Sequence, residues 1–137
     1  MLNNITFIDN IVENKSAKND LLEANVENFK TYMVANSYSD RTIETYEKRL
    51  WIALDILRWQ KVLNGSEITQ DVVTALELKL QMREYHGKLI SSNTVREYVI
   101  TLLAYLKWMW RTARIEEDVS ERVKVPRWQE PEDYRLP

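Results

Sequence analysis

The sequence of 137 residues contains no cysteine, one histidine, two glycines and three prolines. Without cysteine the chain can form neither a disulfide framework nor a thiolate metal site, and a reducing, intracellular location is expected. A single histidine supplies too few ligands for most zinc sites. We therefore expect no metal and no cofactor. So few glycines and prolines argue against a series of tight hairpins, while Leu, Glu, Lys, Arg and Ala are plentiful, which favours helices.

Long apolar runs are also missing. No stretch of about 18 apolar residues, the length that spans a bilayer, occurs. The amino terminus, MLNNITFIDNIVENK, lacks the basic flank and apolar run of a signal peptide. We expect a soluble, cytoplasmic protein with no membrane partner. An apolar content of 45% is enough for the core of one domain.

Apolar residues at helical spacing predict an all-α fold, a compact bundle of four main helices with a short fifth helix around 118–123. The first helix runs from about Asp20 to Asn36. The second is capped by Ser39 and runs to about Leu63, and the third runs from Thr69 to a stop at Gly87. The fourth and longest helix begins at Ser91 or Ser92 and ends near Arg114. The third helix is expected to bury Val72, Val73, Leu76, Leu80 and Met82, with His86 at the end of that helix.

The predicted helices occupy only part of the chain. Residues 1–18 are weakly patterned and are interpreted as a flexible leader, followed by a helical domain over 19–127. Residues 128–137 lie in a segment, VKVPRWQEPEDYRLP, that carries all three prolines. Prolines in such a segment are typical of an extended connector, so 128–137 are interpreted as the start of a linker to a further domain.

Positive charge is concentrated on the fourth helix although the whole chain has a net charge of -2. Residues 87–114 contain five Lys or Arg against one acidic residue, whereas residues 115–137 contain four against seven. The helical period places a basic row along this helix, consisting of Asn93, Arg96, Ile100, Lys107, Arg111 and Arg114. Several cations on one rigid rod suit a row of phosphates, although an ordinary solvated helix face has the same appearance.

Other candidate features carry weaker signals. Arg41, Thr45 and Lys48 point away from the apolar stripe of the second helix, where acidic neighbours also fit a mixed surface. Five tryptophans could stack on bases, but Trp51, Trp108 and Trp110 are better placed for the core or an interface. Adjacent residues diverge on a helix, so the run Glu116–Asp118 is interpreted as solvated and not as a metal site. No Ser-His-Asp set, HExxH or phosphate loop is present, so no catalytic residue is assigned.

Four segments in order resemble the core-binding, SAM-like amino-terminal domain of tyrosine recombinases and phage integrases. They are NFKTYMVANSYSDRTIETYEKRL, ITQDVVTALELKL, SSNTVREYVITLLAYLKWMWRTARI and VKVPR. They match the first helix, the Ser-x-x-Thr-x-x-x-Tyr opening of the second, the third helix, the Ser/Thr-rich opening of the fourth, and a basic residue after proline before the linker. The resemblance covers about residues 24–127.

The resemblance implies that this domain forms half of a C-shaped clamp on double-stranded DNA, with its second and fourth helices facing a core recombination site. It implicates Asn93 and Arg96 in reading base edges, because Asn can pair with adenine and Arg with guanine. The remaining residues would position phosphates. The complete implied DNA-binding set is Arg41, Thr42, Thr45, Lys48, Arg49, Lys88, Ser92, Asn93, Arg96 and Lys107.

The resemblance also implies partners, and the sequence departs from the family's pattern in two respects. The partners are a catalytic domain of the same polypeptide and other recombinase protomers on DNA, so the chain would be associated with the nucleoid when bound. The family's Asn-Pro after the long helix is Asp118-Val119 here, and its catalytic Arg, Lys, His-x-x-Arg and Tyr pattern is absent, so this chain is not itself expected to be an enzyme. The alternatives are a helical protein-interaction module and a non-catalytic accessory DNA-binding protein.

Overall fold

Hydroxyl side chains begin three of the four α-helices in the computed structural model, which describes residues 20–129. The expected leader, 1–18, and residues 130–137 lie outside the described residues. The Oγ of Ser39 accepts from the amide of Thr42 at 3.1 Å, the Oγ1 of Thr69 from Val72 at 3.2 Å, and the Oγ of Ser91 from Thr94 at 3.2 Å. Each bond satisfies an amide that the first turn leaves without a helical partner. The helices are α3 (Asp40–Trp59), α4 (Gln70–Gln81) and α5 (Ser92–Arg111).

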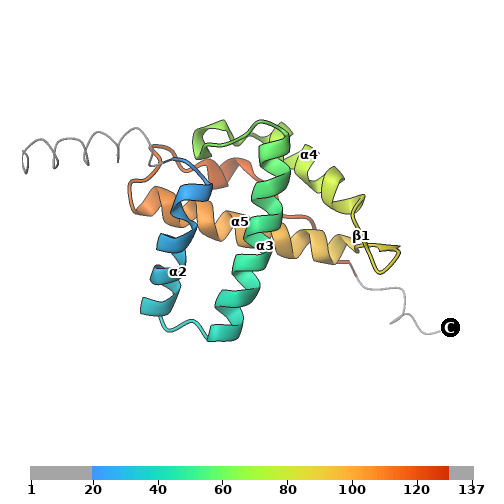
Figure 1. Ribbon diagram of the computed structural model, residues 1–137. Coiled ribbons are helices and arrows are strands. Elements are labelled where there is room, and N and C mark those ends of the chain that lie inside the picture. Colours follow the sequence, from blue (N-terminus) through green and yellow to red (C-terminus); the bar gives the residue numbers. More distant parts are fainter. Residues whose placement is uncertain (1–19, 130–137) are drawn as a thin grey trace, which may run out of the picture.

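The four main helices form an all-α bundle around the crossing of α3 and α5 (Figure 1). A short 3-10 helix, η1 (Glu23–Asn25), leads into α2 (Val26–Ala35), which packs against α3 on one side. Helix α4 contacts both α3 and α5. The fold class predicted from the helical spacing is therefore confirmed. The short fifth element is also present as a 3-10 helix, η3 (Val119–Arg122), which packs against α5.

An aromatic cluster joins α2 to the second half of α5. The ring of Phe29 meets those of Tyr105 and Trp108 at centroid distances of 5.2 Å each. The buried Tyr105 hydroxyl donates to the carbonyl of Leu22, and burial raises the pKa of Tyr105. The guanidinium of Arg114 lies 4.3 Å from the centre of the Trp108 ring, and its Nε donates to Asn25 at 2.9 Å. This cluster closes the end of the bundle where α5 finishes.

Helix α3 ends at Trp59, earlier than the predicted Leu63, because a left-handed residue stops it. Lys61 adopts a φ of 63°, and the amides of Lys61 and Val62 donate back to the carbonyls of Arg58 and Leu57 at 2.9 Å each. This is the Schellman arrangement, in which glycine is the usual left-handed residue. A lysine gives no such signal in the sequence. The 3-10 helix η2 (Gly65–Glu67) follows.

Helix α4 also ends early, at Gln81, and an antiparallel hairpin replaces its predicted last turn. Strand β1 (Glu84–Tyr85) pairs with β2 (Lys88–Leu89) through a two-residue turn at His86 and Gly87, with φ values of 52° and 79°. Two consecutive positive φ values are typical of the type I′ turn that joins strands tightly. The prediction that His86 ends a helix is wrong. So is the predicted burial of Met82, which is 72% exposed.

The tryptophans divide between the core and the surface. Trp108 is 6% exposed, in agreement with its predicted burial. Trp51 and Trp110 are 40% and 41% exposed, so they do not belong to the core, and their role at an interface stays a prediction. Among residues 20–129, no helix is both long and apolar enough to cross a membrane.

Candidate nucleic-acid interface

The first half of α3 carries part of the predicted DNA-binding set on one surface. Arg41, Thr42, Thr45 and Arg49 line a shallow depression of about 260 Å³, together with Tyr46. Arg41 is exposed and takes part in no ion pair with another described residue. A cation without a carboxylate partner gives up no ion pair when it binds a phosphate.

The two other cations on this half of α3 are already paired. Lys48 meets Glu44, one turn earlier, at 3.3 Å, and both side chains are largely exposed. Arg49 meets Glu97 of α5, also at 3.3 Å. The second pair connects the two helices of the predicted interface. Glu97 therefore brings negative charge to a surface on which phosphates are expected.

The basic row on α5 is shorter than the helical spacing predicts. Lys107 and Arg111 are exposed and unpaired within the described part of the chain. Arg96 is half-buried, and its Nε is buried without a hydrogen-bond partner among the described residues. Arg114 does not belong to the row, because α5 ends at Arg111 and the Arg114 side chain packs on Trp108.

The first turn of α5 is occupied by the segment that follows η3. The side-chain amide of Asn93 donates to the carbonyl of Gln129 at 2.6 Å and its oxygen accepts from the Gln129 amide at 2.8 Å. Ser92 donates to the side chain of Gln129 at 3.1 Å. Reading an adenine would require both the nitrogen and the oxygen of the Asn93 side-chain amide. Both atoms are already hydrogen-bonded to Gln129.

Lys88 lies outside α5, in the interval between the predicted third and fourth helices. It belongs to β2 of the hairpin, where its side chain is exposed. The sequence reading missed the neighbouring Arg83 and Tyr85 because the helical pattern of α4 was extended across them. The signal that would have revealed the hairpin was the pair His86-Gly87 between two short segments.

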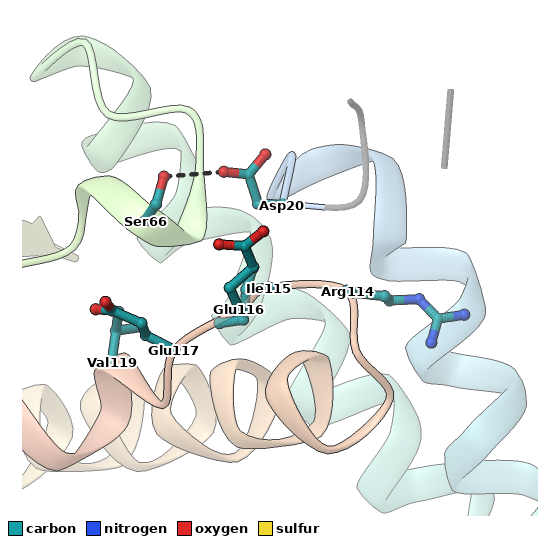
Figure 2. Close-up of a pocket in the computed structure, with 7 residues that line it drawn as sticks. All are labelled: Asp20, Ser66, Arg114, Ile115, Glu116, Glu117 and Val119. Carbon is teal, nitrogen blue, oxygen red and sulfur yellow. Dashed lines mark hydrogen bonds between the residues drawn. The ribbon is translucent and has the colours of Figure 1, made fainter. Parts of the chain in front are cut away.

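The pocket shown in Figure 2 is acidic and suits no phosphate. It has a volume of about 480 Å³ and lies between the end of α5, η2 and the start of the described chain, with Asp20, Glu116 and Glu117 on its walls. Ser66 donates to Asp20 at 2.9 Å, and Glu117 pairs with Arg122 at 3.1 Å. Figure 2 shows Arg114 directed away from these carboxylates. No cluster of three or more metal-binding side chains occurs among the described residues.

Comparisons with known proteins give one informative likeness. No protein-family model matches the chain, and no curated protein matches its sequence. Among solved structures, the chain is similar to the N-terminal domain of a phage integrase/site-specific recombinase (tnp) from Haloarcula marismortui. The TM-score is 0.65 at 18% sequence identity, and the match covers 77% of this chain and 96% of the other. At this identity the likeness concerns the fold.

Proposed function

We propose that this chain is the DNA-binding amino-terminal domain of a site-specific tyrosine recombinase or phage integrase. It grips duplex DNA at a recombination site through α3, α5 and the hairpin, and it does not itself cut DNA. The observation that carries this proposal is the similarity of the helical arrangement to an integrase amino-terminal domain. The cations without carboxylate partners on these elements are the second support, because phosphate contacts supply most of the affinity of such domains.

The proposed contacts divide into two kinds. Arg41, Thr42, Thr45, Lys48, Arg49, Lys88, Ser92 and Lys107 position the duplex through its phosphates. Asn93 and Arg96 read base edges, which requires Gln129 to leave Asn93 when DNA binds. Residues 128–137 lead into a catalytic domain of the same polypeptide, and neighbouring recombinase protomers on the DNA are further partners.

Salt dependence of duplex binding tests the proposal. If about five phosphates are contacted, affinity should fall by roughly 10² to 10³ between 50 and 200 mM salt. K107A should weaken binding to all sequences equally and lower the salt slope by about one unit, whereas R96A should cost about 1–3 kcal/mol chiefly on the correct site. K79A, which removes an exposed cation from the last turn of α4, is the matched control.

A protein-interaction module is the second candidate, and the exposed tryptophans favour it. Trp59 is 83% exposed on α3, with Trp51 at 40% on the same helix. Association through such side chains would persist at high salt, because apolar burial is not weakened by screening. Salt-insensitive self-association that is lost in W59A, together with no retention on duplex DNA, would support this candidate over DNA binding. A third candidate is a non-catalytic accessory DNA-binding protein. A reading frame that continues past Pro137 into a catalytic domain would support the recombinase over this candidate.

A further inference from the structure

The β1–β2 hairpin has one cationic, aromatic face and one acidic face. Tyr85 pairs with Lys88, Glu84 pairs with Leu89, and the amide of Ile90 donates to the carbonyl of Arg83 at 3.0 Å. Residues directly opposite in antiparallel strands share a face, and alternate residues along a strand share it too. One face therefore holds Arg83, Tyr85, Lys88 and Ile90. The carboxylate of Glu84 belongs to the opposite face with Leu89.

The cationic face of the hairpin looks onto the bundle across a groove. Ile90 is partly buried and packs against the hydrophobic core, which turns this face inward. Together with Ile52 of α3 and Tyr98 of α5, the hairpin residues line a groove of about 480 Å³. Tyr85 remains 71% exposed, so its ring is a wall of the groove and not a part of the core. Figure 1 shows the hairpin projecting beyond the bundle next to the start of α5.

The charges of the groove are not neutralised from within the described chain. Neither Arg83 nor Lys88 takes part in an ion pair there. Asp55, which shares a smaller depression with Arg83, is engaged by Arg58 at 2.7 Å. Glu84 and Leu89, which belong to the other face of the hairpin, also line the groove. Two unpaired cations beside an exposed aromatic ring over an apolar floor fit a ligand that is both anionic and planar.

We propose that this groove binds one nucleotide of an unpaired DNA strand, with its phosphate between Arg83 and Lys88 and its base against Tyr85. Stacking on an aromatic ring requires a base face, which a paired base inside a duplex does not offer. The site rests on the proposed function for its ligand, and it adds a contact to single-stranded DNA beside the duplex grip. Arg83, Tyr85 and Lys88 lie within six consecutive positions, so the site is formed without the catalytic domain.

The test compares a blunt duplex with the same duplex carrying a short single-stranded extension, measured by fluorescence anisotropy with the full chain. The extension should tighten binding, and Y85A should remove that gain, with a loss of roughly 5- to 100-fold on the extended substrate. R83A and K88A should reduce the gain and its salt dependence. M82A is the matched control, because Met82 is similarly exposed, at 72%, just before the hairpin, and does not line the groove.

The outcomes separate this site from the duplex grip. An extension that gives no gain, while blunt duplex binds with the expected salt slope, would overturn the groove and leave the proposed function standing. If the chain binds no duplex but retains a Tyr85-dependent affinity for a single-stranded oligonucleotide, the proposed function is overturned and the groove site stands. Displacement of the oligonucleotide by polyglutamate at equal concentration of charge would show an anionic peptide site, which also contradicts the proposal. Circular dichroism of Y85A and M82A confirms that both variants fold.

Discussion

Asn93 holds the backbone of Gln129 by both groups of its side-chain amide, at 2.6 Å through its nitrogen and 2.8 Å through its oxygen. The two residues are 36 positions apart, and they join the first turn of α5 to the segment beyond η3. The same two groups would be needed to pair with adenine in base reading. Contact with Gln129 and contact with a base are therefore alternatives for Asn93.

Substitution N93A should release the segment around Gln129. Each exposed hydrogen bond contributes about 1 kcal/mol or less, so the free energy of unfolding should fall only slightly. Faster hydrogen exchange at the Gln129 amide, measured by NMR, checks the release directly. S120A, which removes a side-chain contact with Asp118 at the start of η3, is the control and should leave that amide protected. Unchanged exchange at Gln129 in N93A would contradict the contact.

Substitution E97Q should strengthen DNA binding. It removes a negative charge from between α3 and α5, and it releases Arg49 from its ion pair at 3.3 Å. Exposed ion pairs are worth about 0.2–1 kcal/mol, so a gain of up to several-fold at low salt is expected. Titration of labelled duplex at 50 and 200 mM salt measures it. E116Q, which changes the acidic pocket by the same charge, should have no such effect, and a weaker complex in E97Q would place Arg49 outside the interface.

Loss of the Tyr105 hydroxyl should destabilise the bundle. In Y105F the carbonyl of Leu22 loses its buried donor, which costs about 1–3 kcal/mol in urea denaturation at neutral pH. Y32F is a suitable control, because Tyr32 is only partly buried in the same cluster. A neutral effect of Y105F would mean that water or another donor satisfies Leu22.

The same tyrosine predicts a loss of stability at alkaline pH. Burial raises the pKa of Tyr105 in the folded chain above its ordinary value near 10. The unfolded chain therefore releases this proton first, so the stabilising contribution is complete below about pH 10 and is lost as the pH rises further. This contribution should approach about 1.4 kcal/mol per pH unit, so the slope should be smaller in Y105F. Equal slopes in Y105F and the unsubstituted chain between pH 10 and 11.5 would contradict it.

Substitution G65A should overpack the contact between η2 and the segment after α5. A Cβ at Gly65 would lie 2.9 Å from the Cγ2 of Ile115, which is too close for two carbons. Overpacking of this kind costs about 1–3 kcal/mol. In an I115A background the same change should cost much less, because the contacting methyl is gone. A double-mutant cycle by thermal denaturation measures the coupling, and additive effects would show that Ile115 moves aside without cost.

Local features of the sequence were enough to place most of the fold. The caps at Ser39, Thr69 and Ser91 were predicted because the hydroxyl and the amide that it satisfies are three residues apart. The ends of α3 and α4 were missed. Lys61 adopts a positive φ that non-glycine residues rarely take, and a lysine gives no signal of it. The pair His86-Gly87 was a turn signal, but the helical pattern of α4 was extended across it.

The candidate site was less predictable than the fold. Helical spacing placed Lys107 and Arg96 on one row of α5, but it also placed Arg114 there, beyond the end of the helix. Lys88 was grouped with the helix residues of the DNA-binding set, although it lies on a strand. The charge of a residue can be read from the sequence, whereas its carboxylate partner depends on the packing of distant segments.

The sequence by itself determined the four helices, the caps of three of them and most apolar residues of the core, because these depend on contacts within one or two helical turns. Only the tertiary structure decided that Arg49 meets Glu97, that Asn93 holds Gln129, and that Arg83, Tyr85 and Lys88 share a groove with Ile52 and Tyr98. Each of these relationships joins segments that are far apart in the chain. Their geometry is set by the turn at His86 and Gly87 and by the crossing of α3 and α5, which no local pattern encodes.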